Sequence, residues 1–254
     1  PDMKEYELYP GEFRYKYPVA GKKNAKVSVH TYIVDSKAVK KMDVPLDDDG
    51  YIPRIKYAHG ADQLIVMTLN RHQNLFKMFA TNGRSGVSKL LIQDESKYWI
   101  DPDNMDYVTF YPDFFVFASE RSGYRHLYQY TLTGDLIKPI TKGEWNVTAY
   151  LGYDNVSKSF YYQSTEEGAI YRAIYKVDAK GKSLKLSEKK GINNASFSEG
   201  CKYYVNQFSN SATPLQVTVY NQQAKELRSI ENNAALTNEL NKIGYSKKEF
   251  FTFK

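Results

Sequence analysis

The feature that most constrains the fold of this 254-residue chain is a repeat of short apolar strands at nearly constant spacing. Alternating stretches begin near residues 27, 75, 127, 171 and 215, so consecutive units lie 44 to 52 residues apart. Each unit has another apolar strand before this one and a polar turn after it, as in Thr133-Gly134-Asp135 and Lys180-Gly181-Lys182. Glycine accepts the positive φ that tight turns need. Units of three or four short strands, repeated every 40–50 residues or so, are typical of a β-propeller.

The sequence therefore predicts an all-β fold: a partial β-propeller of about four blades of antiparallel sheet plus a partial one, with a short C-terminal helix. A β-sandwich is the alternative, but it does not require the unit to recur. We expect residues 1–22 to form an extended arm or the end of an upstream blade, and residues 23–232 to form the blades. Residues 233–244 contain good helix formers and end at a glycine, which predicts a helix. Residues 247–254 alternate like a strand.

Composition excludes several other classes of protein. Hydrophobic residues make up 42% of the chain and charged residues 25%, which excludes a wholly disordered protein. No uninterrupted apolar run approaches 18 residues, so no transmembrane helix is expected. The lysine pairs that contribute to the net charge of +6 are scattered among acids, which favours a solvated surface over a nucleic-acid or membrane patch. A single cysteine, Cys201, excludes an intrachain disulfide and a zinc module.

Motifs that carry chemistry are missing from the sequence. There is no Gly-x-Ser-x-Gly nucleophile motif, no phosphate-binding loop and no dinucleotide fingerprint. The four histidines lie on different repeats without an i, i+4 pair, and the acidic run Asp47-Asp48-Asp49-Gly50 lacks the ligand ladder of a calcium loop, so we interpret it as a hairpin turn. We therefore predict no catalytic, substrate-binding or metal-binding residue and no cofactor in this chain.

Four ordered motifs carry a family resemblance that covers the chain from about residue 10 to its end. The strongest is the pair formed by Ser119-Glu120-Arg121-Ser122-Gly123-Tyr124-Arg125-His126-Leu127-Tyr128 and Thr141-Lys142-Gly143-Glu144-Trp145-Asn146-Val147. The other two are Tyr17-Pro18-Val19-Ala20-Gly21-Lys22-Lys23-Asn24 and Leu69-Asn70-Arg71-His72-Gln73-Asn74. Together they resemble the dipeptidyl peptidase IV branch of the prolyl oligopeptidase family.

The resemblance implies a serine exopeptidase that releases N-terminal Xaa-Pro or Xaa-Ala dipeptides and combines an eight-bladed propeller with an α/β-hydrolase domain. This chain would be the C-terminal half of that propeller, with residues 233–254 as a helix and linker strand leading to the absent hydrolase domain. No Glu-Glu pair precedes Tyr17, and the family's Ser, Asp and His triad would lie beyond Lys254, so no catalytic role transfers and the chain alone is predicted to be inactive.

The resemblance also implies the partners and location of the parent protein. We expect peptide substrates, the hydrolase domain of the same chain and a homodimer, with no nucleic acid and no membrane span. A periplasmic or otherwise extracytoplasmic bacterial location is expected, although no signal peptide is present in this chain.

We expect the residues matched to the family motifs to be structural: propeller side chains can bridge neighbouring blades, and an indole can pack between sheets. These residues are Arg71, Gln73, Asn74, Ser119, Gly123, Tyr124, Arg125, His126, Gly143 and Trp145. Loops at the open face of the propeller would contribute to function by gating and positioning peptide. The alternative is a propeller-type protein or ligand binding module with no enzymatic partner. A Gly-x-Ser-x-Gly motif downstream in the full-length gene would decide between them.

Overall fold

The computed structural model describes residues 2–4, 8–9, 11–17, 19–58 and 63–253. Backbone contacts divide the chain into two compact units. Unit 1 comprises residues 1–93 and 97–99, and unit 2 comprises residues 94–96 and 100–254.

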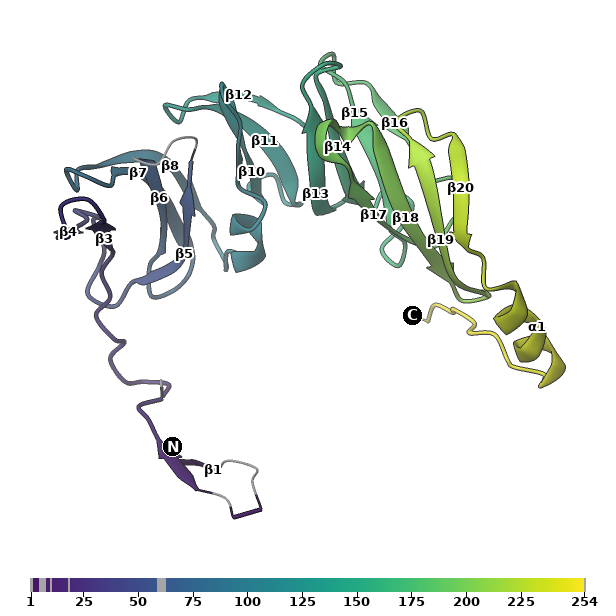
Figure 1. The fold of residues 1–254 in the computed structure, drawn as a ribbon, viewed down its shortest axis with the longest axis horizontal. Helices are drawn as coiled ribbons and strands as arrows, with labels where there is room; N and C mark the ends of the chain where they lie inside the picture. The colour runs from purple at the N-terminus through teal and green to yellow at the C-terminus, as the bar shows by residue number, and fades with distance from the viewer. Residues whose placement is uncertain (1, 5–7, 10, 18, 59–62, 254) are drawn as a thin grey trace. The chain divides into compact units, whose positions relative to one another are not determined.

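The described strands form four four-stranded antiparallel sheets in which chain neighbours pair with each other (Figure 1). The sheets comprise β5 (Tyr51–Tyr57), β6 (Gln63–Leu69), β7 (Leu75–Asn82) and β8 (Ser88–Glu95); β9 (Thr109–Phe110), β10 (Phe114–Ser119), β11 (His126–Thr131) and β12 (Leu136–Pro139); β13 (Val147–Asp154), β14 (Ser159–Ser164), β15 (Ala173–Val177) and β16 (Ser183–Lys185); and β17 (Ile192–Phe197), β18 (Tyr203–Asn210), β19 (Thr213–Asn221) and β20 (Glu226–Glu231). This arrangement confirms the all-β partial propeller, with one blade-like meander in each repeat.

Two smaller sheets precede these four. β3 (His30–Ile33) pairs with β4 (Ala38–Lys41), which corresponds to the predicted partial unit. The predicted strand from residue 27 is shorter than expected, because only four of its residues pair with β4. Upstream, β1 (Asp2–Lys4) pairs with β2 (Glu12–Arg14), so the described part of residues 1–22 contains a two-stranded sheet. The division at residue 22 remains a prediction.

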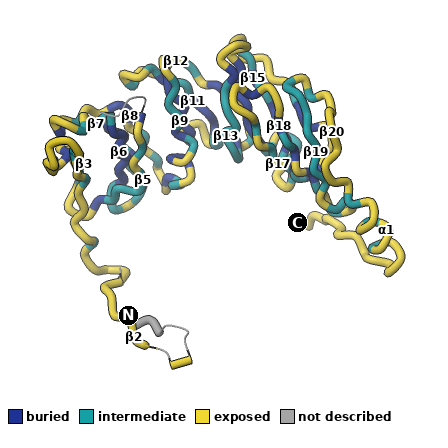
Figure 2. The backbone as a smooth tube through the Cα atoms, viewed as in Figure 1, coloured by how far each residue is buried: buried dark blue, intermediate teal, exposed yellow. Residues whose placement is uncertain are grey.

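Central strands are buried on both faces. Every residue of β10 and of β14 is buried, whereas every residue of β20 is exposed (Figure 2). In unit 2 one apolar cluster joins the sheet β9–β12 to the sheet β13–β16, and a second joins the sheet β13–β16 to the sheet β17–β20. A strand covered on both faces needs apolar residues at successive positions, which explains runs such as Phe-Phe-Val-Phe-Ala in β10. In unit 1, Met42, Leu64 and Val66 form the corresponding core.

Turns follow the sequence closely. Gly134 and Gly181 have φ of +98° and +82° in the turns between β11 and β12 and between β15 and β16, as predicted. Asp47–Gly50 also forms a turn, in which the Gly50 amide donates to the Asp47 carbonyl at 2.9 Å. It is not the hairpin turn we expected, because β4 and β5 belong to different sheets.

The C-terminal segment contains the α-helix α1 (Ala234–Lys242), which lies within the predicted range 233–244. The strand predicted for residues 247–254 is wrong as far as the structure describes it: residues 246–253 form no strand, because no partner strand lies alongside them. Residue 254 lies outside the described part. The short 3-10 helices are η1 (Pro102–Met105) and η2 (Glu199–Cys201). Of the helices described, none is long and apolar enough to cross a membrane.

Candidate functional site

Three of the motif residues form one turn in unit 1. Asn70 organises this turn: its side-chain oxygen accepts hydrogen bonds from the backbone amides of Asn74 and Leu75, both at 3.0 Å. Gln73 has a φ of +55°, and its side chain accepts a hydrogen bond from the Trp99 indole at 3.0 Å. Arg71 donates to the Lys22 carbonyl at 3.2 Å. The Leu-Asn-Arg-x-Gln-Asn motif therefore closes the β6–β7 hairpin.

The other seven motif residues lie in unit 2, where the β10–β11 hairpin begins at Ser119. The Ser119 hydroxyl donates to Asp94 at 2.5 Å and accepts hydrogen bonds from the backbone amide and the Nε of Arg121, at 3.1 and 3.0 Å. Arg121 also lies 3.4 Å from Asp94 and stacks over the Tyr128 ring at 4.7 Å. These bonds hold the Ser119 hydroxyl between Asp94 and Arg121 at the start of the hairpin.

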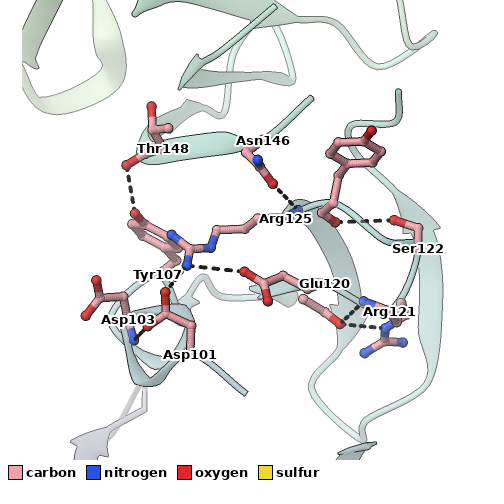
Figure 3. A network of polar contacts seen from close by, with 11 residues as sticks. Asp101, Asp103, Tyr107, Glu120, Arg121, Ser122, Arg125, Asn146 and Thr148 are labelled. Carbon is pink, nitrogen blue, oxygen red and sulfur yellow. Dashed lines mark hydrogen bonds and ion pairs between the residues drawn. The ribbon is translucent and has the colours of Figure 1, made fainter. Parts of the chain in front are cut away.

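Arg125 is the centre of a polar network that holds the hairpin against the preceding loop (Figure 3). Its guanidinium binds Asp101, lies 3.3 Å from Glu120 and covers the Tyr107 ring at 5.7 Å. Asp101 caps η1 by accepting the Asp103 amide at 3.0 Å. Burial is the largest single effect and disfavours the charge of Arg125, but the combined effects of Asp101, Tyr107 and Glu120 exceed it and raise the Arg125 pKa.

The backbone of Arg125 is held from the next sheet. Its amide donates to the Asn146 side chain at 2.8 Å, and its carbonyl accepts from the Val147 amide at 2.8 Å. Asn146 and Val147 lead into β13, so the start of β11 is hydrogen-bonded to the neighbouring sheet. Gly123 supplies the left-handed φ of +94° that the preceding turn needs, and the Tyr124 carbonyl accepts from Ser122 at 3.4 Å.

His126 connects the two halves of the strongest motif. It is 1% exposed, with one ring nitrogen 3.0 Å from the Thr141 hydroxyl and the other 2.9 Å from the Gly143 carbonyl. The carbonyl can only accept, so Nε2 carries the proton; Thr141, which accepts from the Leu127 amide at 3.0 Å, donates to Nδ1. Burial lowers the His126 pKa, more than the Gly143 contact raises it. The ring is a neutral structural contact.

Trp145 packs between two sheets of unit 2. Its indole meets the His126 ring edge-on, with centroids 4.8 Å apart and an interplanar angle of 83°. It also stacks on Tyr162 of β14 at 5.8 Å and 4°. Tyr162 in turn stacks on Tyr175 of β15 at 5.6 Å. Gly143 must lack a side chain, because a Cβ there would lie 2.1 Å from the indole Nε1.

A network of hydrogen-bonded polar side chains, which the sequence did not predict, connects the sheets of unit 2. The Tyr107 hydroxyl donates to the Thr148 carbonyl at 2.7 Å, and the Thr148 hydroxyl donates to Gln163 at 2.6 Å. Gln163 then donates to the Asn193 carbonyl at 2.6 Å, and Asn206 donates to the Asn193 side chain at 3.0 Å. Polar residues inside otherwise apolar strands were the only available signal, and they do not reveal their partners.

Taken together, Arg125 and Trp145 contact consecutive sheets of unit 2. In the part of the chain that the structure describes, no group of three or more His, Cys, Asp or Glu side chains could hold a metal ion. Burial raises the pKa of the Cys201 thiol to about 11, so this thiol is not an activated nucleophile. The geometry holds the β10–β11 hairpin against the preceding loop and the following sheet.

Comparisons with known proteins agree with this architecture. The family model described as the dipeptidyl peptidase IV (DPP IV) N-terminal region matches residues 1–215. Dipeptidyl peptidase 4 of Arthroderma otae is 29% identical over 97% of this chain, and probable dipeptidyl-aminopeptidase B of Aspergillus niger is 31% identical over 91%. The chain spans about a third of the length of these relatives, 33% and 28% respectively.

Solved structures give the same result. The crystal structure of Porphyromonas gingivalis dipeptidyl peptidase 4 matches 94% of this chain with a TM-score of 0.88 and 44% identity, and the match covers 35% of that chain. A putative dipeptidyl aminopeptidase IV from Bacteroides ovatus matches 91% of this chain and 36% of its own, with a TM-score of 0.79 and 20% identity. The second likeness concerns the fold alone.

Proposed function

Because the chain belongs to the dipeptidyl peptidase IV N-terminal region family, we propose that it is the non-catalytic propeller part of a serine exopeptidase that releases N-terminal Xaa-Pro or Xaa-Ala dipeptides. In this role it gates access of peptide and positions it for an α/β-hydrolase domain of the same protein. The observation that carries the proposal is the match to a dipeptidyl peptidase 4 structure across nearly the whole chain. The lack of a Gly-x-Ser-x-Gly motif in the chain agrees with it.

Gating requires sheets that keep their relative positions while peptide passes, and the contacts of unit 2 support such rigidity. Arg125 and Trp145 each contact side chains or backbone of two consecutive sheets, and Gln163 adds a third connection. Most of these groups are buried or half-buried, so water has little access to compete for their hydrogen bonds. The loops at the ends of these sheets are thereby held at fixed positions.

Catalysis is tested with the full-length parent enzyme. We expect it to hydrolyse Gly-Pro-p-nitroanilide and to lose this activity when the serine of its Gly-x-Ser-x-Gly motif is replaced by alanine. The 254-residue chain alone is expected to give no turnover. Turnover by the chain that persists after removal of contaminating peptidases would place catalysis in the propeller and overturn the proposal.

Gating is tested separately by Trp145→Ala in the parent, which removes the indole between two sheets. We expect kcat/KM for Gly-Pro-p-nitroanilide to change by less than about twofold, while cleavage of long peptides with proline at the second position accelerates. Equal loss of activity on short and long substrates would contradict a gating role. Such a result would indicate instead that the substitution destabilises the enzyme as a whole.

The location and assembly of the parent are also proposals. We propose an extracytoplasmic, periplasmic enzyme that acts as a homodimer, on the strength of the family resemblance. We expect fractionation of the source cells to give activity in the periplasmic fraction. We expect light scattering of the purified parent to give twice the protomer mass. Activity confined to the cytoplasm, or a monomer at micromolar concentration, would contradict the respective proposal.

A further inference from the structure

The loop between β14 and β15, residues 165–172, is fixed at both ends to the sheets on either side of its own. At its start, the Thr165 amide donates to the Asn146 carbonyl and the Asn146 amide donates to the Thr165 hydroxyl, both at 3.0 Å. At its end, the Arg172 amide donates to the Gly191 carbonyl at 2.9 Å. Between these anchors, no described backbone group of residues 166–171 bonds to a neighbouring sheet.

Two adjacent carboxylates hold the middle of this loop to its own sheet. Glu166 accepts hydrogen bonds from the hydroxyls of Tyr162 and Ser164, both at 3.2 Å, and Glu167 accepts one from the Tyr175 hydroxyl at 3.2 Å. The rings of Tyr162 and Tyr175 stack on each other, so the two carboxylates are drawn to the same face of the sheet. Burial raises the pKa of both tyrosines, so their hydroxyls keep the proton and remain donors.

The two carboxylates differ in their counter-charges. Glu167 pairs with the Lys185 ammonium at 2.8 Å, and this hydrogen bond is the largest effect that lowers the Glu167 pKa. Glu166 has only the two neutral hydroxyls as donors. Burial, the largest effect, and repulsion by Glu167 raise the Glu166 pKa. Ionisation of Glu166 therefore places a second negative charge beside Glu167 without a cation of its own.

The other charged groups near Glu166 do not neutralise it. Those that line the same groove between sheets are Lys138, Lys142, Asp178 and Lys180. Lys138 donates to the Ala179 carbonyl at 3.0 Å, and Asp178 accepts the Lys180 amide at 2.9 Å. In the part of the chain that the structure describes, Glu167 is the one charged neighbour that acts on the Glu166 pKa.

We propose that residues 165–172 form a pH-dependent latch, which is closed against the sheet when Glu166 is neutral and loosened when Glu166 and Glu167 are both ionised. Protonation of Glu166 removes the repulsion between the carboxylates, and the neutral carboxyl still exchanges hydrogen bonds with the hydroxyls of Tyr162 and Ser164.

The direction of the pH effect follows from the raised Glu166 pKa. Such a group stabilises the closed loop fully below the ordinary glutamate pKa of about 4.3, and this contribution is lost as the pH rises through the value in the folded protein. The latch therefore closes on acidification and loosens toward neutral pH. It is a property of the loop itself and does not depend on the proposed gating role.

The test is millisecond hydrogen exchange with mass spectrometry on the full-length parent enzyme, from about pH 4.5 to about pH 7.5. Protection is the intrinsic exchange rate at each pH divided by the observed rate. The Gly168 and Tyr171 amides report the closed loop, because they donate to the carbonyls of Thr165 and Gly168 at 2.9 and 3.0 Å. We expect their protection to fall at least about threefold across this range, while peptides of β18 change less than about 1.5-fold.

Three variants locate the effect. Glu166→Gln keeps a neutral side chain at every pH and should hold protection of the loop constant at its acidic value. Glu167→Gln removes the pair with Lys185 and should lower protection even at about pH 4.5. Glu199→Gln, at an exposed glutamate of the same unit outside the loop, is the matched control and should keep the wild-type pH dependence. Constant protection in the wild type, the same pH dependence in Glu166→Gln, or a parallel loss of protection in β18 would each overturn the proposal.

Discussion

Replacing Gly143 by alanine tests whether the two halves of the strongest motif form one packed unit. A Cβ at this position would lie 2.1 Å from the Trp145 Nε1 and 2.7 Å from its Cδ1. The indole cannot move aside freely, because Tyr162 stacks on it at 5.8 Å and His126 meets it edge-on at 4.8 Å. The substitution should therefore displace Trp145 and weaken the hydrogen bond between His126 and the Gly143 carbonyl.

The expected destabilisation has two parts. Gly143 has a φ of +146°, where a residue with a side chain is strained by about 1–3 kcal/mol. Overpacking against the indole adds about 1–3 kcal/mol. The total of roughly 2–6 kcal/mol is a large fraction of the stability of an ordinary domain, about 5–15 kcal/mol. For a chain of this size, each kcal/mol lowers Tm by about 2–4 °C.

The assay is urea unfolding followed by Trp145 fluorescence in a Trp99→Phe background, since the chain has only 2 tryptophans. Gly123→Ala is the matched control, because Gly123 also has a positive φ, +94°, but its added Cβ would meet nothing within 4 Å. The difference between the two variants isolates the clash with Trp145. If Gly143→Ala destabilises no more than Gly123→Ala and leaves the Trp145 emission unchanged, the packing argument is refuted.

Three further perturbations follow from the same contacts. Arg125→Met leaves the Asp101 carboxylate without its cation and should cost about 2 kcal/mol in urea unfolding, whereas adding Asp101→Asn should cost less than the sum of the two single changes. Additive costs would show that the pair is not coupled. Gln163→Leu removes the amide that bonds Thr148 and Asn193 and should cost about 1–3 kcal/mol, with faster hydrogen exchange in β13 and β17; unchanged exchange there would contradict it. Because burial lowers the His126 pKa, the folded state prefers the neutral ring, so this contribution to stability is complete above about pH 6.5 and is lost as the pH falls below that value. Tm measured from about pH 7.5 to about 5.5 should fall more steeply in the wild type than in His126→Gln; parallel curves would contradict the assignment.

Prediction of the fold succeeded because its information is local and repeated. The spacing of the strands, the apolar central runs and the glycines of the turns at Gly134 and Gly181 are each read without knowledge of the partner strand. The C-terminal strand failed for the opposite reason. Residues 247–254 alternate as an edge strand would, but a strand also needs a hydrogen-bonding neighbour, and alternation does not supply one.

The motif residues show the same division. The expectation that Trp145 packs between sheets followed from its size and its single N–H, and in the structure its ring stacks on Tyr162 of β14. Only the tertiary structure shows that Trp145 packs against Gly143 and the edge of the His126 ring. Asp101 and Tyr107 were not identified at all, although the Asp-Pro sequence at Asp101 is typical of the start of a helical turn.

The sequence by itself determined the class of fold, the number of four-stranded sheets and the family, because periodic burial and ordered motifs are properties of the chain alone. Only the tertiary structure decided which side chains hold consecutive sheets together. Arg125 meets Asp101 across 24 positions of the sequence, and Gln163 meets Asn193 across 30. Such contacts depend on how stacked sheets bring distant strands side by side, and many polar residues on each strand could satisfy the same local pattern.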